Sequence, residues 1–146
     1  MTPLSLEILL VEDDPNDIEL TLRAFKAHHL ANRIQVCHDG AEAVDYLFGE
    51  GQYKGRNVEI TPKVVILDLK LPKVSGLEVL EKIKGDPRTK SVPVVVLTSS
   101  AEERDLVDCY RLGVNSYIVK PVDFEKFIEA AQKVGLYWLL LNQAPH

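Results

Sequence analysis

Short apolar runs alternate with longer amphipathic stretches along this chain. The runs are rich in β-branched residues and too short for helices that stand alone, which is typical of strands buried in a parallel sheet. Five are predicted as strands, over residues 6–11, 33–37, the first part of 63–72, 92–97 and 116–119. The run within 63–72 is unbroken and ends on Asp68, and Pro72 lies just beyond to end the strand. Open α/β sheets place their chemistry at such carboxyl ends, so Asp68 is a candidate functional residue.

A helix is predicted after each strand, because apolar residues recur there at helical spacing. The first helix covers roughly 15–30, and the last runs to about residue 141. The predicted N-caps are the polar residues that precede the helices: Asp14, Asp39, Ser75, Ser100 and Asp123. Gly113 is the predicted C-cap of the fourth helix. Residues 49–62 contain three glycines and several charges, and they are predicted as a loop.

The fivefold strand–helix alternation predicts an α/β fold with a doubly wound, five-stranded parallel sheet and helices on both faces. Two strand orders are common for such sheets, and one is the flavodoxin-like order 2-1-3-4-5, in which the first and third strands are neighbours. Residues 1–146 are expected to form a single domain, with a core at about 5–141.

Composition narrows the function classes. The net charge of −5 gives no electrostatic footprint for nucleic acid or for an anionic membrane. No apolar run is long enough to span a bilayer, and no signal peptide is visible at the N-terminus. Cys37 and Cys109 are isolated, without zinc spacing, so reduced thiols in a cytoplasmic protein are expected.

Polar residues terminate four of the five predicted strands. They are Glu12 and Asp13 after the first, Asp68 after the third, Thr98 at the fourth and Lys120 after the fifth. Each has an ordinary explanation by itself: a helix cap, a turn, a hydroxyl bonded to backbone, or a solvated lysine. These separate explanations do not account for the convergence of all of them at one sheet edge.

Three carboxylates close together repel one another unless a cation neutralises them. An all-oxygen site with few protein ligands and room for water suits Mg²⁺. With a lysine and a hydroxyl nearby, the set has the parts for phosphoryl transfer to a carboxylate nucleophile, which would form an aspartyl phosphate on Asp68.

Together these residues resemble the receiver domain of two-component response regulators, the CheY-like family. The resemblance covers about residues 5–141 and implies the strand order 2-1-3-4-5. The matching positions are the acidic pair Glu12-Asp13, Asp68 within LDLKLP, Gly76, the switch hydroxyl Thr98, the switch aromatic Tyr117 and Lys120-Pro121.

The resemblance implies a role for each matched residue. Asp13 would ligate Mg²⁺ directly and Glu12 mainly through water, and Lys70 would contribute its backbone carbonyl. Asp68 would ligate the metal and attack phosphorus. After phosphorylation, Lys120 would pair with phosphoryl oxygens, Thr98 would move inward to bond them, and Tyr117 would follow into the vacated space. Such a protein is not an enzyme with a separate substrate, because it catalyses only its own phosphorylation and dephosphorylation.

Partners follow from the same resemblance. The family implies a sensor histidine kinase as phosphodonor. The loop after residues 46–49 and the tail 135–141 resemble regulators that serve bacteriophytochrome-type kinases. No output domain follows the fifth predicted helix, so a protein–protein contact is the expected output. The apolar tail, with Tyr137 and Trp138, is expected to form a homodimer face, and the alternative is core packing of an extended helix.

Two rival functions are weighed against this one. An aspartyl phosphatase or mutase needs a second Asp two residues after the nucleophile, and that position is Lys70. A binding module that keeps the fold and works without phosphorylation is the other alternative.

Overall fold

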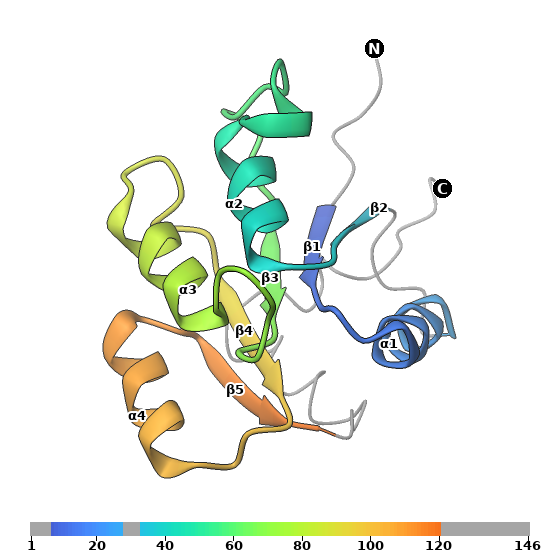
Figure 1. Cartoon of the computed structure of the whole chain (residues 1–146), viewed down its shortest axis with the longest axis vertical. Helices are drawn as coiled ribbons and strands as arrows, with labels where there is room; N and C mark the ends of the chain where they lie inside the picture. Colours follow the sequence, from blue (N-terminus) through green and yellow to red (C-terminus); the bar gives the residue numbers. More distant parts are fainter. Residues whose placement is uncertain (1–6, 28–32, 121–146) are drawn as a thin grey trace, which may run out of the picture.

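The computed structural model describes residues 7–27 and 33–120, which form a five-stranded parallel sheet (Figure 1). The strands are β1 (Glu7–Val11), β2 (Arg33–Cys37), β3 (Val64–Leu67), β4 (Val94–Thr98) and β5 (Ser116–Val119). Their order is β2-β1-β3-β4-β5, and every neighbouring pair is parallel. The predicted fold class and strand order are confirmed.

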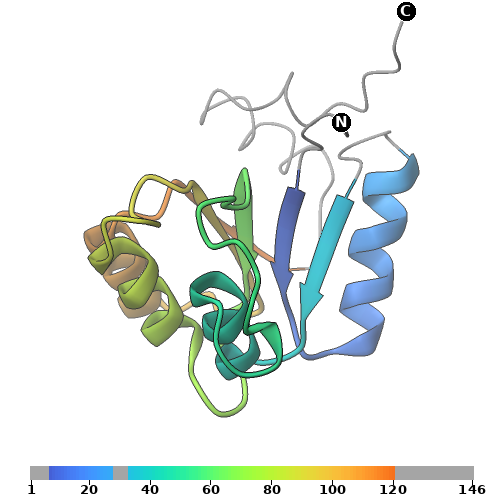
Figure 2. The ribbon, with the colours of Figure 1, turned by 90° about the horizontal axis from the view of Figure 1, so that it is seen from above.

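Helices cover both faces of the sheet. The helices are α1 (Pro15–Ala27), α2 (Gly40–Phe48), α3 (Gly76–Gly85) and α4 (Glu103–Leu112), with a short 3₁₀ helix, η1, at Gly51–Tyr53. Among the described helices, α1 lies on one face, and α2, α3 and α4 lie on the other (Figure 2). The predicted fifth helix, with Tyr137 and Trp138, lies outside the described residues.

Side chains of the strands alternate between two apolar cores, as the period of a strand requires. Leu9 and Val11 of β1 point into the core beneath α2, α3 and α4, whereas Ile8 and Leu10 point into the core beneath α1. All four residues of β3 are buried, which explains its unbroken apolar sequence. The sheet is therefore fixed from both sides, and its strand ends are fixed with it.

Local capping chemistry sets most helix ends as predicted. Asp14 Oδ1 accepts hydrogen bonds from the backbone N–H groups of Asn16 and Asp17 at 2.8 and 3.3 Å. Asp39 and Ser75 accept from the N–H three residues on. Gly113 ends α4 with φ of 100°, a conformation that glycine adopts without a steric penalty.

Two predicted boundaries are wrong. Ser100 does not cap α4, which begins at Glu103 with Glu102 as the residue before it. The Ser100 hydroxyl instead donates to Asp105 Oδ2 in the first turn of α4 at 2.5 Å, and its oxygen accepts from the N–H of Glu102 at 3.4 Å. Strand β4 begins at Val94 rather than at Val92, because Pro93 between them has no N–H to donate to the ladder.

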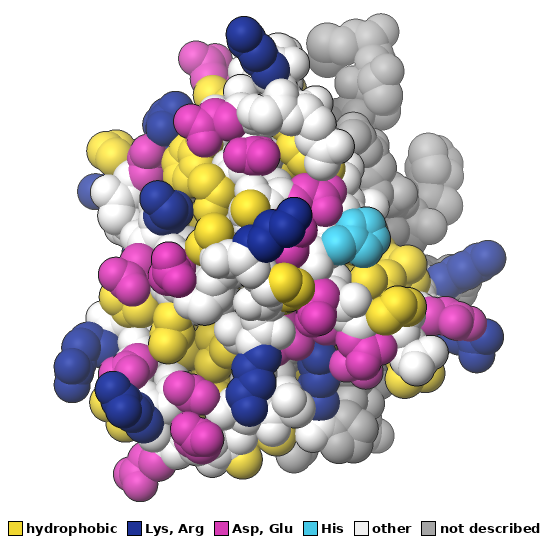
Figure 3. All heavy atoms as spheres, viewed as in Figure 1, with side chains coloured by type: hydrophobic (Ala, Val, Ile, Leu, Met, Phe, Trp, Pro, Cys, Tyr) yellow, Lys and Arg dark blue, Asp and Glu magenta, His cyan; other side chains and the backbone are white. Residues whose placement is uncertain are grey.

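The surface carries charges of both signs. In the face shown in Figure 3, Lys and Arg side chains are interspersed with Asp and Glu. Within residues 7–27 and 33–120, no helix has the length and apolar character needed to cross a membrane.

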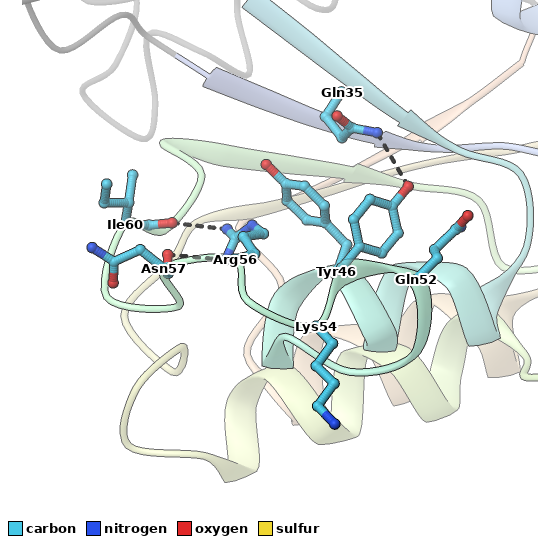
Figure 4. A pocket seen from close by; sticks show the side chains of 8 residues that line it. Gln35, Tyr46, Gln52, Lys54, Arg56, Asn57 and Ile60 are labelled. Atoms are coloured by element: carbon cyan, nitrogen blue, oxygen red, sulfur yellow. Dashed lines mark hydrogen bonds between the residues drawn. The ribbon is translucent and has the colours of Figure 1, made fainter.

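The segment between α2 and β3 has more structure than the predicted loop, since it contains η1. The Tyr53 hydroxyl donates to Glu42 Oε2 at 2.6 Å and accepts from Gln35 Nε2 at 3.4 Å. The Arg56 guanidinium lies 4.0 Å from the centre of the Tyr46 ring and donates to the carbonyl of Ile60 at 2.8 Å. A hollow of about 410 Å³ lies among these side chains (Figure 4). The segment is thus anchored on β2 and α2.

Gly76 tests the packing of α3 against the end of β3. A Cβ added at Gly76 would collide with the backbone of Asp68 and Leu69, whereas one added at Gly85 of the same helix would meet nothing within 4 Å. We expect Gly76→Ala to lower the free energy of unfolding by about 2 kcal/mol or more. Gly85→Ala is the matched control and should be neutral or slightly stabilising. Urea unfolding measures both, and similar values for the two variants would contradict the close packing at Gly76.

Candidate functional site

Lys120 occupies the centre of a polar cluster at the carboxyl edge of the sheet. Its Nζ lies 2.5 Å from Glu12 Oε1, 2.8 Å from Asp17 Oδ2 and 3.0 Å from Asp68 Oδ2. Its backbone N–H donates to the carbonyl of Thr98 at 2.8 Å, which continues the pairing of β5 with β4 by one residue. Segments far apart in the sequence therefore meet at one ammonium group.

The strand register brings the carboxylates together. Val11 pairs with Leu67, so the residues that follow them, Glu12 and Asp68, leave the sheet side by side. Oxygen atoms of Glu12, Asp13 and Asp68 lie within 4.8 Å of one another. Glu12 and Asp68 are buried, whereas Asp13 is exposed. Three carboxylates, one of them open to water, fit the donor set and partial hydration that Mg²⁺ prefers.

Backbone contacts hold Asp68 at the site. Its N–H donates to the carbonyl of Val11 at 3.1 Å, and its Oδ1 accepts from the N–H of Lys70 at 3.2 Å. Gly76, at the start of α3, packs closely against the backbone carbonyl of Asp68. These contacts fix one carboxylate oxygen, and the other, Oδ2, faces Lys120.

Burial and charge shift two pKa values in the site. Burial raises the pKa of Glu12 from 4.5 to about 7, and the negative charge of Asp68 adds to this, against opposing hydrogen bonds from Lys120 and Asp14. Burial disfavours the charged form of Lys120, but its hydrogen bonds with Asp17, Glu12 and Asp68 outweigh burial and raise its pKa. Lys120 is thus held as a cation beside the carboxylates.

A second group of hydrogen bonds links Thr98 to Tyr117. The Thr98 side chain is buried, and its Oγ1 accepts from the N–H of Ser100 at 3.3 Å. The Tyr117 hydroxyl donates to the carbonyl of Ser100 at 2.8 Å, and the Ser100 hydroxyl donates to Asp105 on α4. One chain of hydrogen bonds therefore connects Thr98 through Ser100 to Tyr117 and to the first turn of α4.

The structure brings together the side chains of Glu12, Asp13, Asp68 and Lys120, and the strand end at Thr98 adjoins them through its backbone bond to Lys120. Lys70 lies two residues after Asp68 and contacts its carboxylate through the backbone N–H. Asp17 belongs to the site but was not predicted to do so. Its place in the first turn of a helix has a sufficient local explanation, so only the fold shows that it reaches Lys120.

Comparison with known proteins identifies the family. The model of the response regulator receiver domain matches residues 8–132, and the chain belongs to this family. The probable methanogenesis regulatory protein FilR2 of Methanothrix harundinacea (strain 6Ac) is 44% identical over 94% of this chain and 86% of that protein. Response regulator Rcp1 of Synechocystis sp. (strain ATCC 27184 / PCC 6803 / Kazusa) is 36% identical over 90% of this chain and 88% of that protein.

Solved structures of response regulators are similar to this chain in fold and sequence, in agreement with the family match. The bacteriophytochrome response regulator AtBRR is 54% identical, with a TM-score of 0.85 over 97% of this chain and all of that chain. The phosphorylated cyanobacterial phytochrome response regulator RcpA is 38% identical, with a TM-score of 0.77 over 93% of this chain and 95% of that chain. The Mn²⁺-bound form of Rcp1 is 35% identical, with a TM-score of 0.76 over 96% of this chain and 99% of that chain. This chain is therefore a receiver-domain response regulator related to phytochrome response regulators.

The raised pKa of Glu12 predicts a pH dependence of stability in the metal-free protein. Between pH 4.5 and about 7, the folded protein holds a proton that the unfolded chain has released. The free energy of unfolding should therefore fall as pH rises through this window, by about 1–3 kcal/mol from this group. Urea unfolding in the presence of a chelator, at pH 5 and pH 7.5, measures the change. Glu12→Gln should show a smaller fall, and an unchanged fall would assign the effect to other groups.

Proposed function

We propose that this chain accepts a phosphoryl group on Asp68 from a sensor histidine kinase in a Mg²⁺-dependent reaction. The observation that supports it most is the position of Asp68, buried between the backbone that holds one oxygen and the ammonium that faces the other. Family membership supports the histidine kinase as donor. The reaction is self-modification of this protein, without turnover of a separate substrate.

Each residue has a defined part in the proposed reaction. An Asp68 oxygen attacks phosphorus of the donor phosphohistidine, a P–O bond forms, and the P–N bond breaks with its electrons returning to the imidazole. Lys120 pairs with the oxygens of the transferred group and offsets their charge. Asp13 would bind the metal directly, Glu12 mainly through water, Asp68 through its carboxylate and Lys70 through its backbone carbonyl. Bound Mg²⁺ would neutralise charge on the phosphoryl oxygens.

Phosphorylation would be reported through Thr98 and Tyr117. The Thr98 hydroxyl moves to bond the phosphoryl group, which withdraws the oxygen that Ser100 N–H now contacts. Tyr117, whose hydroxyl donates a hydrogen bond to the Ser100 carbonyl, then turns inward. The half-buried position of Tyr117 leaves it free to respond in this way without unfolding the core.

The names of the relatives favour a particular donor. AtBRR and RcpA are both described as phytochrome response regulators, and this chain is 54% and 38% identical to them. We therefore propose a bacteriophytochrome-type kinase as partner and the cytoplasm as the place of the reaction. Cys37 and Cys109, both buried free thiols, suit a reducing compartment.

Asp68→Asn tests the nucleophile. The amide fills the same space but cannot form the acyl phosphate, so the variant should remain folded and lose phosphorylation by a kinase or by a small phosphodonor. Acid-labile phosphate is measured after incubation with the donor and Mg²⁺. Phosphate retained on Asp68→Asn would refute the assignment. A wild-type protein that takes up no phosphate would instead favour the module that works without phosphorylation.

The output surface proposed here is a face of α4 and β5. Four large apolar side chains are exposed there: Leu106 (37%), Val107 (45%), Tyr110 (50%) and Val119 (40%). The three on α4 lie at helical spacing on one side. We propose that a second copy of this chain covers this face. Tyr137 and Trp138 would belong to the same dimer interface. Burial of the apolar area removed from water would stabilise the homodimer.

The dimer is tested by sedimentation. The wild-type protein should sediment as a dimer at micromolar concentration, and Val107→Glu should weaken association about tenfold or more, because it places a charge in the interface. Leu20→Glu on α1 is the matched control, since Leu20 is also exposed (57%) and lies on another helix. Trp138→Ala should weaken association as well. A monomeric wild-type protein would contradict the proposal.

A further inference from the structure

Asp17 is the partner of Lys120 that stands apart from the predicted metal ligands. Its Oδ2 lies 2.8 Å from Lys120 Nζ, as close as the other two carboxylates of the site. Within residues 7–27 and 33–120, the carboxylates whose oxygens lie close enough together to share one cation are those of Glu12, Asp13 and Asp68, and Asp17 is not among them. Asp17 therefore contacts the ammonium without belonging to the metal-ligand set.

An ammonium group and a divalent cation compete at this site. Lys120 has three N–H donors, and in this structure they are directed to Glu12, Asp17 and Asp68. Two of these acceptors are also oxygens that a divalent cation would use. Binding of the cation therefore weakens the hold of Glu12 and Asp68 on Lys120.

The displaced ammonium still needs a partner. Only 10% of the Lys120 side chain is exposed, and a buried charge that loses its counter-charge is strongly destabilising. Asp17 lies in the first turn of α1 on the solvent side of the cluster, with 32% of its side chain exposed. It can hold Lys120 while the other carboxylates turn toward the metal, and it keeps the ammonium close to Asp68.

We propose that Asp17 is a positioning residue that takes over Lys120 when a divalent cation binds to Glu12, Asp13 and Asp68. This inference rests on the proposed function. Without Asp17, cation binding leaves Lys120 either poorly paired or in competition for Glu12 and Asp68. The affinity for the cation is then lower, and the lysine is no longer held ready for the phosphoryl group.

Calorimetric titration with Mg²⁺ tests the proposal in the intact chain. Asp17→Asn should raise the Kd for Mg²⁺ about fivefold, the size expected for an ion pair that is neither fully buried nor fully exposed. Glu19→Gln is the matched control. It removes the same charge from the same helix, but Glu19 pairs with Arg23 at the surface and not with Lys120. Its Kd should stay within about twofold of wild type.

A double-mutant cycle separates positioning from simple loss of charge. Lys120→Met should bind Mg²⁺ more tightly than wild type, because the competing ammonium is gone. In that background Asp17→Asn should change the Kd by less than about twofold, since Asp17 has nothing to hold. In the protein that keeps Lys120, Asp17→Glu retains the carboxylate and should have a Kd for Mg²⁺ close to that of wild type, unlike Asp17→Asn. Lys120→Gln is a second neutral replacement, and unfolding midpoints in chelator show which variants are folded.

The outcomes are distinct. Equal Mg²⁺ affinities of Asp17→Asn and Glu19→Gln in a wild-type protein that binds Mg²⁺ would overturn the inference and leave the proposed function intact. An equal loss with and without Lys120 would also overturn it, because the effect would then come from charge alone. A wild-type protein that binds no Mg²⁺ would contradict the proposed function itself.

Discussion

A single ammonium group joins the parts of this molecule that the sequence keeps far apart. Lys120 follows the last described strand, yet it contacts carboxylates that follow β1, begin α1 and follow β3. Each of these carboxylates alone would be costly to bury, and so would the lysine. Together they satisfy one another, and the sheet must hold its strand ends in register for them to do so. The same ion pairs therefore set the geometry of the site and stabilise the carboxyl edge of the sheet.

The backbone around the site is built with little room to adjust. Gly76 has no space for a side chain against Asp68, and Gly40 has none against Val74. Lys73, which lies between Asp68 and Gly76 in the sequence, has φ of 67°, which is uncommon for a residue other than glycine. The segment that follows Asp68 is thus packed closely against both neighbouring helices. Rigid support of this kind would keep the proposed nucleophile in place during phosphoryl transfer.

Much of this could be predicted from the sequence, because strong local patterns coincide with the global fold. The buried strands and the polar residues that end them follow from the apolar runs. The strand order, and with it the convergence of Glu12, Asp13, Asp68 and Lys120, was implied by the resemblance to the receiver family. The errors arose where a side chain has a hydrogen-bond partner that its sequence pattern does not indicate. Ser100 has the pattern of a cap but bonds Asp105. Asp17 has the pattern of a helix-start acid and also pairs with a lysine more than a hundred residues away. Sequence spacing carries no signal for such a pairing.

The anchored segment between α2 and β3 lies at the opposite end of the sheet from the acidic cluster, because α2 begins at the carboxyl edge and runs back along the sheet (Figure 1). Its contacts through Tyr53 and Arg56 are made to β2, to α2 and within the segment itself. Grafting a different peptide there would leave the end that carries the proposed phosphoacceptor untouched. One pole of the molecule can thus acquire new recognition properties while the chemistry at the other pole stays constant.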